Sequence, residues 1–250
     1  MILRWKYKGD KLMAKVYYDF HLHSCLSPCG DNDMTPANIA GMAFINGLNA
    51  IALTDHNTVR NCTSLKKAAE QYGITVLYGM ELTTDEEVHT VCLFPNEVSA
   101  VKWEKYVYSK HQKIKNNPDI FGHQYIMNET DGILGEEENL LINATNISFE
   151  DVFDPVFDLG GIAYPAHVDK NSNSLISNLG FVHPEIRFSI AEVHDLSKLE
   201  ELTKTHTYFE KCKILSSSDA HYLQDINEAK NYLEIDNPTP EGIIEYLRSL

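Results

Sequence analysis

The sequence predicts an α/β fold in which strands and helices alternate around a barrel. Short apolar runs rich in β-branched and aromatic residues are followed by stretches with helical spacing, and this order recurs along most of the 250 residues. Several of the apolar runs end in a histidine or an acid. Active sites of parallel α/β barrels lie at the carboxyl ends of the strands, so the pattern predicts one site at one rim.

The first half of the chain carries the clearest alternation. Val16–Phe20 predicts a strand, and Thr35 followed by Pro36 predicts the start of a helix that ends at Gly47. The other elements expected in this half are strands at 49–54, 74–82 and 89–94, and a helix at 64–72.

The second half is less regular. A helix is expected at 98–115, inside a segment from about 97 to 148 that otherwise lacks clean periodicity and that we expect to form an inserted cap beside the barrel mouth. Residues 1–15 include a basic start and are expected to be an N-terminal extension, with residues 16–250 as one barrel domain. The remaining expected elements are strands at 160–167, 188–193 and 213–217, and helices at 148–158, 199–210 and 240–250.

Charge and cysteine content narrow the class of protein. A net charge of −15 disfavours a groove for a long nucleic-acid duplex, although metal cations could reverse the local sign for a small phosphate ester. The five cysteines are odd in number, and neither a signal peptide nor a membrane-spanning run is evident, so we expect a cytoplasmic protein with free thiols and no membrane partner. Cys25 and Cys29 have no second pair and do not predict a structural zinc knuckle.

Four short segments hold most of the metal-binding side chains. Imidazoles and carboxylates are the ligands that suit Zn, Mn or Fe, and four such segments at strand ends predict one site with several metals. The segments are Asp19-Phe20-His21-Leu22-His23, Leu53-Thr54-Asp55-His56-Asn57, Ala163-Tyr164-Pro165-Ala166-His167 and Ser216-Ser217-Ser218-Asp219-Ala220-His221.

Strand alternation predicts which of these side chains share a face. His21 and His23 are two positions apart and should point into the same cavity, as should Asp219 and His221. Asp55 and His56 are adjacent and should point to opposite faces. We therefore expect His56 to bind a metal directly and Asp55 to orient a ring nitrogen, or to serve only as a turn or helix cap.

Glu81, His89 and His167 each stand alone in the sequence. Glu81 ends a strand and could bridge two metals, whereas the lone histidines matter only if the fold brings neighbours to them. Arg60, Lys170 and Arg187 lie after or near strand ends and are candidate contacts for a phosphate, each with the plain alternative of an ordinary surface base.

The four segments, in this order, resemble the motifs of the PHP (polymerase and histidinol phosphatase) superfamily of metal-dependent phosphoesterases, from about Val16 to Leu233. The resemblance implies a distorted seven-stranded (β/α) barrel with three divalent transition metals (Zn, Mn or Fe) at its carboxyl face. It implies the ligands His21, His23, His56, Glu81, His89, His167, Asp219 and His221. A further acid should come from the loop after the first motif, either Asp31, which we favour, or Asp33.

These expectations together describe a phosphoesterase that uses a metal-activated hydroxide. The expected substrate is a small phosphomonoester or a short nucleotide, and the oligomeric state is open. The chain has neither a P-loop nor a Gly-x-Ser-x-Gly elbow, which fits chemistry without a protein nucleophile. The alternatives are an amidohydrolase-like metal hydrolase, disfavoured because no lysine stands at an apolar strand end, and a non-catalytic metal-holding barrel.

Overall fold

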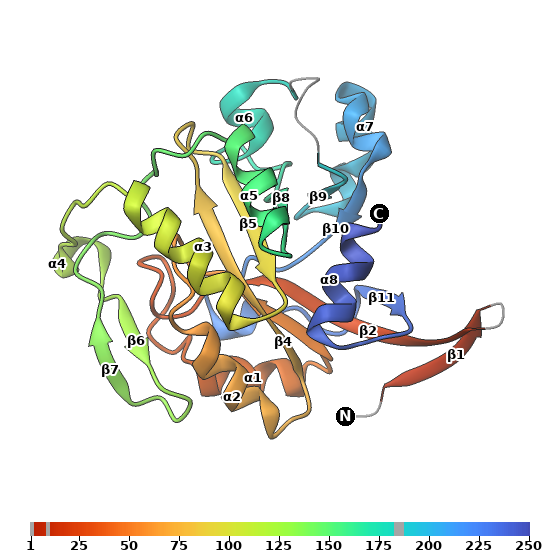
Figure 1. The fold of residues 1–250 in the computed structure, drawn as a ribbon, viewed down its shortest axis with the longest axis horizontal. Coiled ribbons are helices and arrows are strands. Elements are labelled where there is room, and N and C mark those ends of the chain that lie inside the picture. The colour runs from red at the N-terminus through yellow and green to blue at the C-terminus, as the bar shows by residue number, and fades with distance from the viewer. Residues whose placement is uncertain (1–2, 9–10, 183–187) are drawn as a thin grey trace.

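The computed structural model describes residues 3–8, 11–182 and 188–250 and confirms the α/β class (Figure 1). The strands are β1 Arg4–Lys8, β2 Lys11–Leu22, β3 Ala50–Leu53, β4 Thr75–Thr83, β5 His89–Phe94, β6 Tyr125–Met127, β7 Ile133–Glu136, β8 Ile162–Pro165, β9 Ile190–Glu192, β10 Lys213–Leu215 and β11 Tyr232–Ile235. The α-helices are α1 Pro36–Ile45, α2 Cys62–Glu70, α3 Glu97–Lys110, α4 Pro118–Phe121, α5 Phe153–Asp158, α6 Leu175–Leu179, α7 Leu199–Thr205 and α8 Pro240–Arg248. Single-turn 3₁₀ helices are η1 Glu150–Val152, η2 Leu196–Lys198, η3 Thr207–Lys211 and η4 Leu223–Asp225.

The main sheet is open and mixed. It has seven strands in the order β1-β2-β3-β4-β5-β8, with β11 also paired to β2. Neighbours β2, β3 and β4 run parallel, whereas β5 runs antiparallel to both β4 and β8. The prediction of a parallel barrel is therefore wrong for β5. Residues 84–88 form a tight turn that is too short for the crossover that a parallel neighbour of β4 would need.

Closure of the barrel is incomplete in the described part of the chain. Strands β9 and β10 form a separate parallel pair, and a single bridge joins Leu22, at the end of β2, to Ala220, beyond the end of β10. Further links are side-chain to backbone, such as the 3.2 Å hydrogen bond from the Phe20 amide to the Ser217 hydroxyl. The β9–β10 pair thus completes the rim without joining the main ladder.

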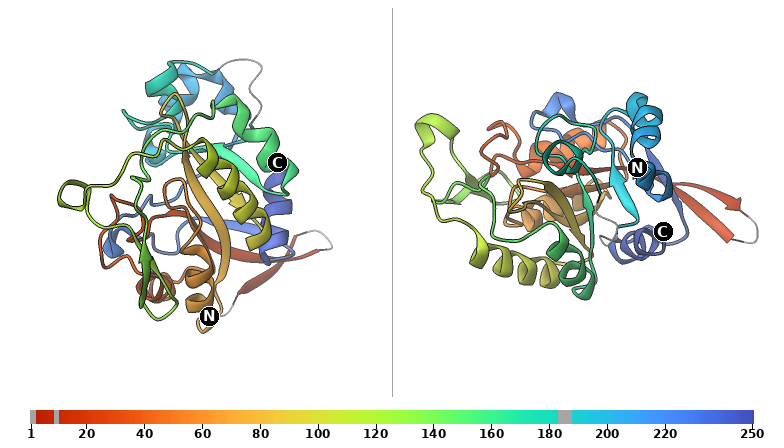
Figure 2. Two further views of the ribbon diagram at one scale, coloured as in Figure 1. Left: turned by 60° about the vertical axis from the view of Figure 1, so that its left-hand side comes forward. Right: turned by 90° about the horizontal axis from the view of Figure 1, so that it is seen from above.

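Side chains from the two faces of the sheet pack into separate clusters. The inner cluster contains Val16, Tyr18 and Phe20 of β2 and is covered by α8, whose Ile243 and Leu247 are fully buried. The outer cluster packs the other face against α1, α2 and α3, which lie on one side of the sheet in Figures 1 and 2. This two-sided burial explains why the strands are continuous apolar runs.

Several boundaries differ from the sequence expectations. Strand β2 begins at Lys11 and pairs with β1, so a hairpin occupies most of the segment expected as an extension. Helix α3 ends at Lys110 and not at 115, because His111 leaves the helix to form a bridge with Thr145. The segment from 97 to 148 also contains the β6–β7 hairpin. Among the described helices none is long and apolar enough to cross a membrane.

Candidate metal centre

A bulge in β2 decides the direction of the two histidines of the first motif. Upstream, Val16 and Phe20 belong to the inner cluster, whereas Leu22 belongs to the outer one. The β2–β3 register shifts between Asp19 and Leu22, so the alternation changes phase there. His21 and His23 consequently face the inside of the curled sheet. Without the bulge, regular alternation along β2 would have pointed them to the outer face.

The first donor group consists of His21, His23, Glu81 and Asp219, whose ligand atoms lie within 4.8 Å of one another. The Nε2 atoms of His21 and His23 are 3.3 Å apart and lie 3.3 and 3.2 Å from Oδ1 of Asp219. Oε1 of Glu81 is 3.2 Å from His21 Nε2, and Oε2 is 3.2 Å from His23 Nε2. The His21, His23 and Glu81 side chains are buried and that of Asp219 is 6% exposed, so the four donors converge on a largely buried site.

The second donor group surrounds the other side of Glu81. Nδ1 of His89 is 2.9 Å from Glu81 Oε1, and Nε2 of His167 is 3.2 Å from the same atom. Nδ1 of His56 is 3.1 Å from Glu81 Oε2. His89 reaches this rim because β5 is antiparallel, which places its first residue opposite Thr83, the last residue of β4. Glu81 is therefore the centre of the arrangement.

The third donor group includes a cysteine. Ligand atoms of His23, Cys29, His56 and His221 lie within 4.8 Å of one another, and the Cys29 side chain is partly exposed. The structure does not place Asp31 in any of the donor groups found among the described residues. The Asp31 carboxylate instead accepts a 2.9 Å hydrogen bond from the Asp33 amide in an exposed turn.

The histidine tautomers suit metal binding. The Ser27 hydroxyl donates to Asp55 (2.7 Å), so it accepts from Nδ1 of His23 (3.0 Å). Nδ1 of His21 lies 2.9 Å from the Glu192 carboxylate, and Nδ1 of His221 lies 2.8 Å from the Asp219 carbonyl oxygen. Because both partners are acceptors, each ring carries its proton on Nδ1. The Nε2 lone pairs of these histidines are thus left for a metal.

The residues fit divalent transition metals by a second criterion. His56 Nδ1, His167 Nδ1 and Asp219 Oδ1 are buried and form no hydrogen bond in the described part of the chain, although His56 Nδ1 and Asp219 Oδ1 lie 3.1–3.3 Å from other donors of the cluster. Buried polar atoms without partners are costly, and a bound cation would satisfy them. Imidazole and carboxylate together suit Zn, Mn or Fe.

The charges of the first group are strongly coupled. Burial alone would raise the pKa of Glu81, but His89, His21 and His56 hold that pKa well below its usual range. Burial alone would lower the pKa of His23, but the carboxylates of Asp219 and Glu81 raise it to about 9. The acids are therefore ionised and ready to act as ligands, while protons on the imidazoles compensate their charge before a metal binds.

Three motif residues have left-handed backbone conformations. Asn57, His167 and Asp219 have positive φ values of 55°, 26° and 54°, a region that is uncommon for residues other than glycine. The buried Asp19 carboxylate secures the last segment by accepting the amides of Ser218 (3.0 Å) and Asn227 (3.1 Å). Surrounding hydrogen bonds thus hold donor residues in orientations that their own backbone preferences oppose.

The predicted cations have carboxylate partners in this structure. Lys170 Nζ contacts Oδ2 of Asp219, directly beside the first donor group. The Arg60 guanidinium is paired with Glu137, and its Nε lies 3.7 Å from Glu104, so it faces two acids of the 97–148 segment. Arg187 lies outside the described residues.

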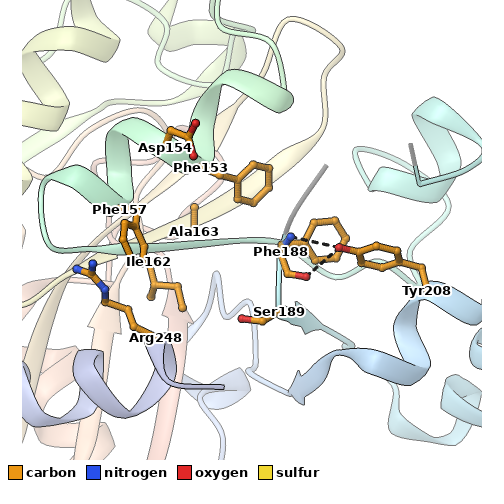
Figure 3. A pocket seen from close by; sticks show the side chains of 9 residues that line it. All are labelled: Phe153, Asp154, Phe157, Ile162, Ala163, Phe188, Ser189, Tyr208 and Arg248. Carbon is orange, nitrogen blue, oxygen red and sulfur yellow. Dashed lines mark hydrogen bonds between the residues drawn. The ribbon is translucent and has the colours of Figure 1, made fainter. Parts of the chain in front are cut away.

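Two hollows lie at different ends of the fold. A cavity of about 610 Å³ adjoins the donor groups and is lined by Cys29, His194, Asp219 and His221, with residues from 216–218 and 222–227. A second cavity of about 320 Å³, seen in Figure 3, lies near the start of β8 and is lined mainly by aromatic and apolar side chains. The first cavity is the one that gives a substrate access to the donors.

Sequence reasoning missed Cys29 and Glu192. Glu192 ends the apolar strand β9, the same signal that selected Glu81, and its carboxylate also accepts the His167 amide at 3.1 Å. Cys29 carried a weaker signal, because two cysteines four positions apart point first to a structural zinc knuckle, for which no second pair exists. Cys25 in fact lies apart, with its sulfur 3.2 Å from that of Met127.

Comparison with known proteins identifies relatives of this site. A family model described as PHP domain matches residues 19–172. An uncharacterised protein, MJ1587 of Methanocaldococcus jannaschii, is 35% identical over 88 residues, covering 32% of this chain and 50% of that protein. A 5′-3′ exoribonuclease of Haemophilus influenzae is 34% identical over 79 residues, covering 30% of this chain and 28% of that enzyme. The chain thus spans half or less of the length of these relatives in the matched parts.

Solved structures share the fold at low identity. Endonuclease Q of Pyrococcus furiosus, a lesion-specific endonuclease, superimposes with a TM-score of 0.66 at 17% identity, covering 94% of this chain and 56% of that one. An amidohydrolase of Chromobacterium violaceum gives a TM-score of 0.59 at 19% identity, covering 94% of this chain and 96% of that one. At such identities the likeness concerns the fold.

One expectation from composition is contradicted. Endonuclease Q has also been solved with a 27-mer duplex that carries an abasic lesion at the active site (TM-score 0.65, 17% identity, 94% of this chain and 57% of that one). The expectation of a small substrate, with duplex nucleic acid excluded, is therefore wrong, because a protein with this fold binds a duplex. Net charge averages over the whole surface, whereas metals bound by the donor groups would set the local potential at the rim.

Proposed function

The chain belongs to the PHP domain family, and from this premise we propose that it is a metal-dependent phosphoesterase that cleaves phosphodiester bonds in nucleic acids. The observation that carries the proposal is the convergence of three donor groups beside an open cavity. Adjacent metal positions suit phosphoryl transfer, because metals can clamp both the attacking and the departing oxygen. The similarity to an exoribonuclease supports a nucleic acid as the substrate class.

In this proposal, three sets of residues would each bind or help to bind one metal. His21, His23, Glu81 and Asp219 would hold one metal, Glu81 with His89 and His167 a second, and His56 with His221 would contribute to a third. Bound metals would supply Lewis acidity and lower the pKa of a water molecule.

Other residues position these donors. Glu192 orients His21, and Asp55 acts through Ser27 on His23. Lys170 is the cation that contacts Asp219, and when that carboxylate binds a metal the ammonium becomes available to a phosphate oxygen. Arg60 could contact a phosphate only by exchanging its present carboxylate partners.

We further propose that the segment from 97 to 148 covers the edge of the mouth. Asn57 donates hydrogen bonds to the carbonyl oxygens of Leu141 (2.7 Å) and Asn143 (2.9 Å), which ties this segment to the second motif. The amide of Tyr125 donates to the carbonyl oxygen of Cys25 at 3.1 Å, and Figures 1 and 2 place the β6–β7 hairpin beside that loop. The cap is therefore positioned to influence which substrates enter.

A substrate panel tests the proposal. Protein loaded with Mn²⁺ or Zn²⁺ is offered single-stranded RNA, single-stranded DNA, duplexes with and without an abasic site, bis-p-nitrophenyl phosphate, p-nitrophenyl phosphate and an N-acyl amino acid. We expect cleavage of the diesters and its loss in Asp219→Asn. Asp225→Asn is the matched control, because Asp225 lines the same cavity without belonging to a donor group. Turnover of the amide alone, or of none of these compounds, contradicts the proposal.

A further inference from the structure

We propose that Cys29 is a thiolate ligand that, together with His56 and His221, forms a metal position selective for a thiophilic divalent ion such as Zn²⁺, Fe²⁺ or Co²⁺. The inference rests on the proposed metal-dependent function and specifies one of its metals. It departs from the family resemblance, which implies an acid from the same loop. The resulting centre holds unlike metals, with one sulfur-bound position beside two bound by nitrogen and oxygen alone.

The assignment of donors follows from the contacts. His23 also lies near Cys29, but its Nε2 already faces Glu81 and Asp219 at 3.2 Å, within the first donor group. His221 donates Nδ1–H to the Asp219 carbonyl oxygen, so its Nε2 lone pair is available. His56 is 2% exposed, and its Nδ1 lies 3.1 Å from Glu81 Oε2 without forming a hydrogen bond among the described residues, so His56 borders both Glu81 and the third set. We therefore assign Cys29, His56 and His221 as the ligands of the third metal position.

The loop that carries Cys29 is fixed by its own hydrogen bonds. Gly30 donates its amide to the Ser27 carbonyl oxygen at 2.9 Å, and a Cβ at Gly30 would lie 2.2 Å from the Ser24 carbonyl oxygen. The Asp31 amide donates to the His221 carbonyl oxygen at 2.9 Å, which joins this loop to the last motif. The thiol is therefore held beside His221 by the backbone.

Solvent access makes this position different from the first donor group. Cys29 and His221 line the 610 Å³ cavity, whereas in the first donor group Asp219 reaches that cavity and His21, His23 and Glu81 are buried. Three protein ligands with an open side are typical of a metal that exchanges or meets substrate. A thiolate favours Zn, Fe or Co over Mn and Mg, which prefer oxygen donors.

The test reads metal binding without any substrate. Wild type, Cys29→Ser, Cys29→Asp and Cys212→Ser are loaded with Co²⁺, and near-ultraviolet absorption is followed for the thiolate-to-cobalt charge-transfer band. Bound Zn²⁺ is counted in parallel, and circular dichroism checks the fold. Cys212 is the matched control, because it is a partly exposed cysteine outside the donor groups.

We expect the band in wild type and in Cys212→Ser and its loss in both Cys29 variants. Loss of a direct ligand should weaken one Zn²⁺ by more than about 100-fold in Cys29→Ser, since changes in outer-shell partners alone cost up to that much. Cys29→Asp should keep the third metal without the band and should accept Mn²⁺ there. If Cys29→Ser does not fold, Cys29→Asp gives the answer.

The proposal is overturned if wild type shows no band, if the band persists in a folded Cys29 variant, or if Zn²⁺ content is unchanged in Cys29→Ser. Failure of the proposed function has a different signature. A protein with the full metal content and the band that cleaves no phosphodiester refutes the function and leaves the thiolate ligand in place.

Discussion

The hollow beside the donor groups and the hollow at the start of β8 differ in how their polar groups are satisfied. In the second hollow, the Tyr208 hydroxyl is hydrogen-bonded to both the amide (3.3 Å) and the carbonyl oxygen (3.0 Å) of Phe188 (Figure 3). The Arg248 guanidinium lies over the Phe157 ring at 3.7 Å from its centroid. Near the first hollow, Asp219 Oδ1 and the Nδ1 atoms of His56 and His167 are buried and form no hydrogen bond among the described residues, although Asp219 Oδ1 and His56 Nδ1 lie within 3.3 Å of other donors.

The comparison teaches that volume alone does not identify a functional site. The hollow at β8 is lined mostly by aromatic and apolar groups, and the polar atoms named there are paired within the chain. In the donor groups, by contrast, several buried metal-binding atoms without hydrogen bonds among the described residues lie close together. Buried atoms elsewhere, such as the ring nitrogens of His111, also lack hydrogen bonds, so the clustering of such atoms with further donors is the better criterion.

Replacement of Glu81 should give the largest effect. Glu81→Gln removes the one carboxylate shared by the first two donor groups, so phosphodiester cleavage should fall by at least about a thousandfold, which corresponds to several kcal/mol of lost transition-state stabilisation. Initial rates and bound metal are measured together, with Asp225→Asn as the control. Near-normal rates in folded Glu81→Gln would remove the basis for treating the donor groups as the active site.

The pH dependence of stability should change in Asp19→Asn. Burial raises the pKa of Asp19 from 3.8 to about 6, although amide hydrogen bonds oppose the shift. Because the folded-state pKa is the higher one, this group's contribution to stability is full below about pH 4 and is lost as pH rises through about 6. Relative to wild type, Asp19→Asn should therefore gain about 3 kcal/mol between pH 4 and pH 7.

The measurement is urea unfolding of metal-free wild type and variant across that pH range. The variant also loses one hydrogen-bond acceptor, which lowers its stability by a similar amount at every pH. A parallel pH profile for the two proteins would show that Asp19 is ionised in both folded and unfolded states.

Loss of the charge on Glu192 should have a moderate effect. Glu192→Gln keeps an oxygen near His21 Nδ1 but removes the carboxylate that makes the ring a stronger ligand, so metal affinity should fall by about 10-fold to 100-fold. Competition with a fluorescent zinc chelator measures this change. An unchanged affinity would mean that packing alone orients His21.

The smallest effect is expected in the other hollow. Arg248→Ala removes the contact with the Phe157 ring and should lower the free energy of unfolding by about 0.5–1 kcal/mol, with metal content and cleavage rates unchanged. Thermal unfolding and metal analysis provide the readouts. A loss of metal in this variant would show that the hollow at β8 affects metal binding at the donor groups, which would contradict the distinction drawn between the two hollows.

Most donors were predictable because local sequence carries their chemistry. His21, His23, Asp219 and His221 lie at or just beyond the ends of apolar strands, and the structure brings them together with Glu81, His89 and His167. Asp31 was not predictable in the same way. It lies in an irregular loop, where no periodicity indicates which side chain points inward.

The sequence by itself determined the α/β class, the strands at the rim and the nature of the donors, since burial and alternation act over a few neighbouring residues. The tertiary structure decided the reversal of β5, the bulge that turns His21 and His23 inward, and the placing of Cys29, and not Asp31, beside His56 and His221. Each of these depends on contacts between segments far apart in the chain, such as the hydrogen bond from Asp31 to His221. Local patterns cannot encode which loop residue such a contact leaves facing the donor groups.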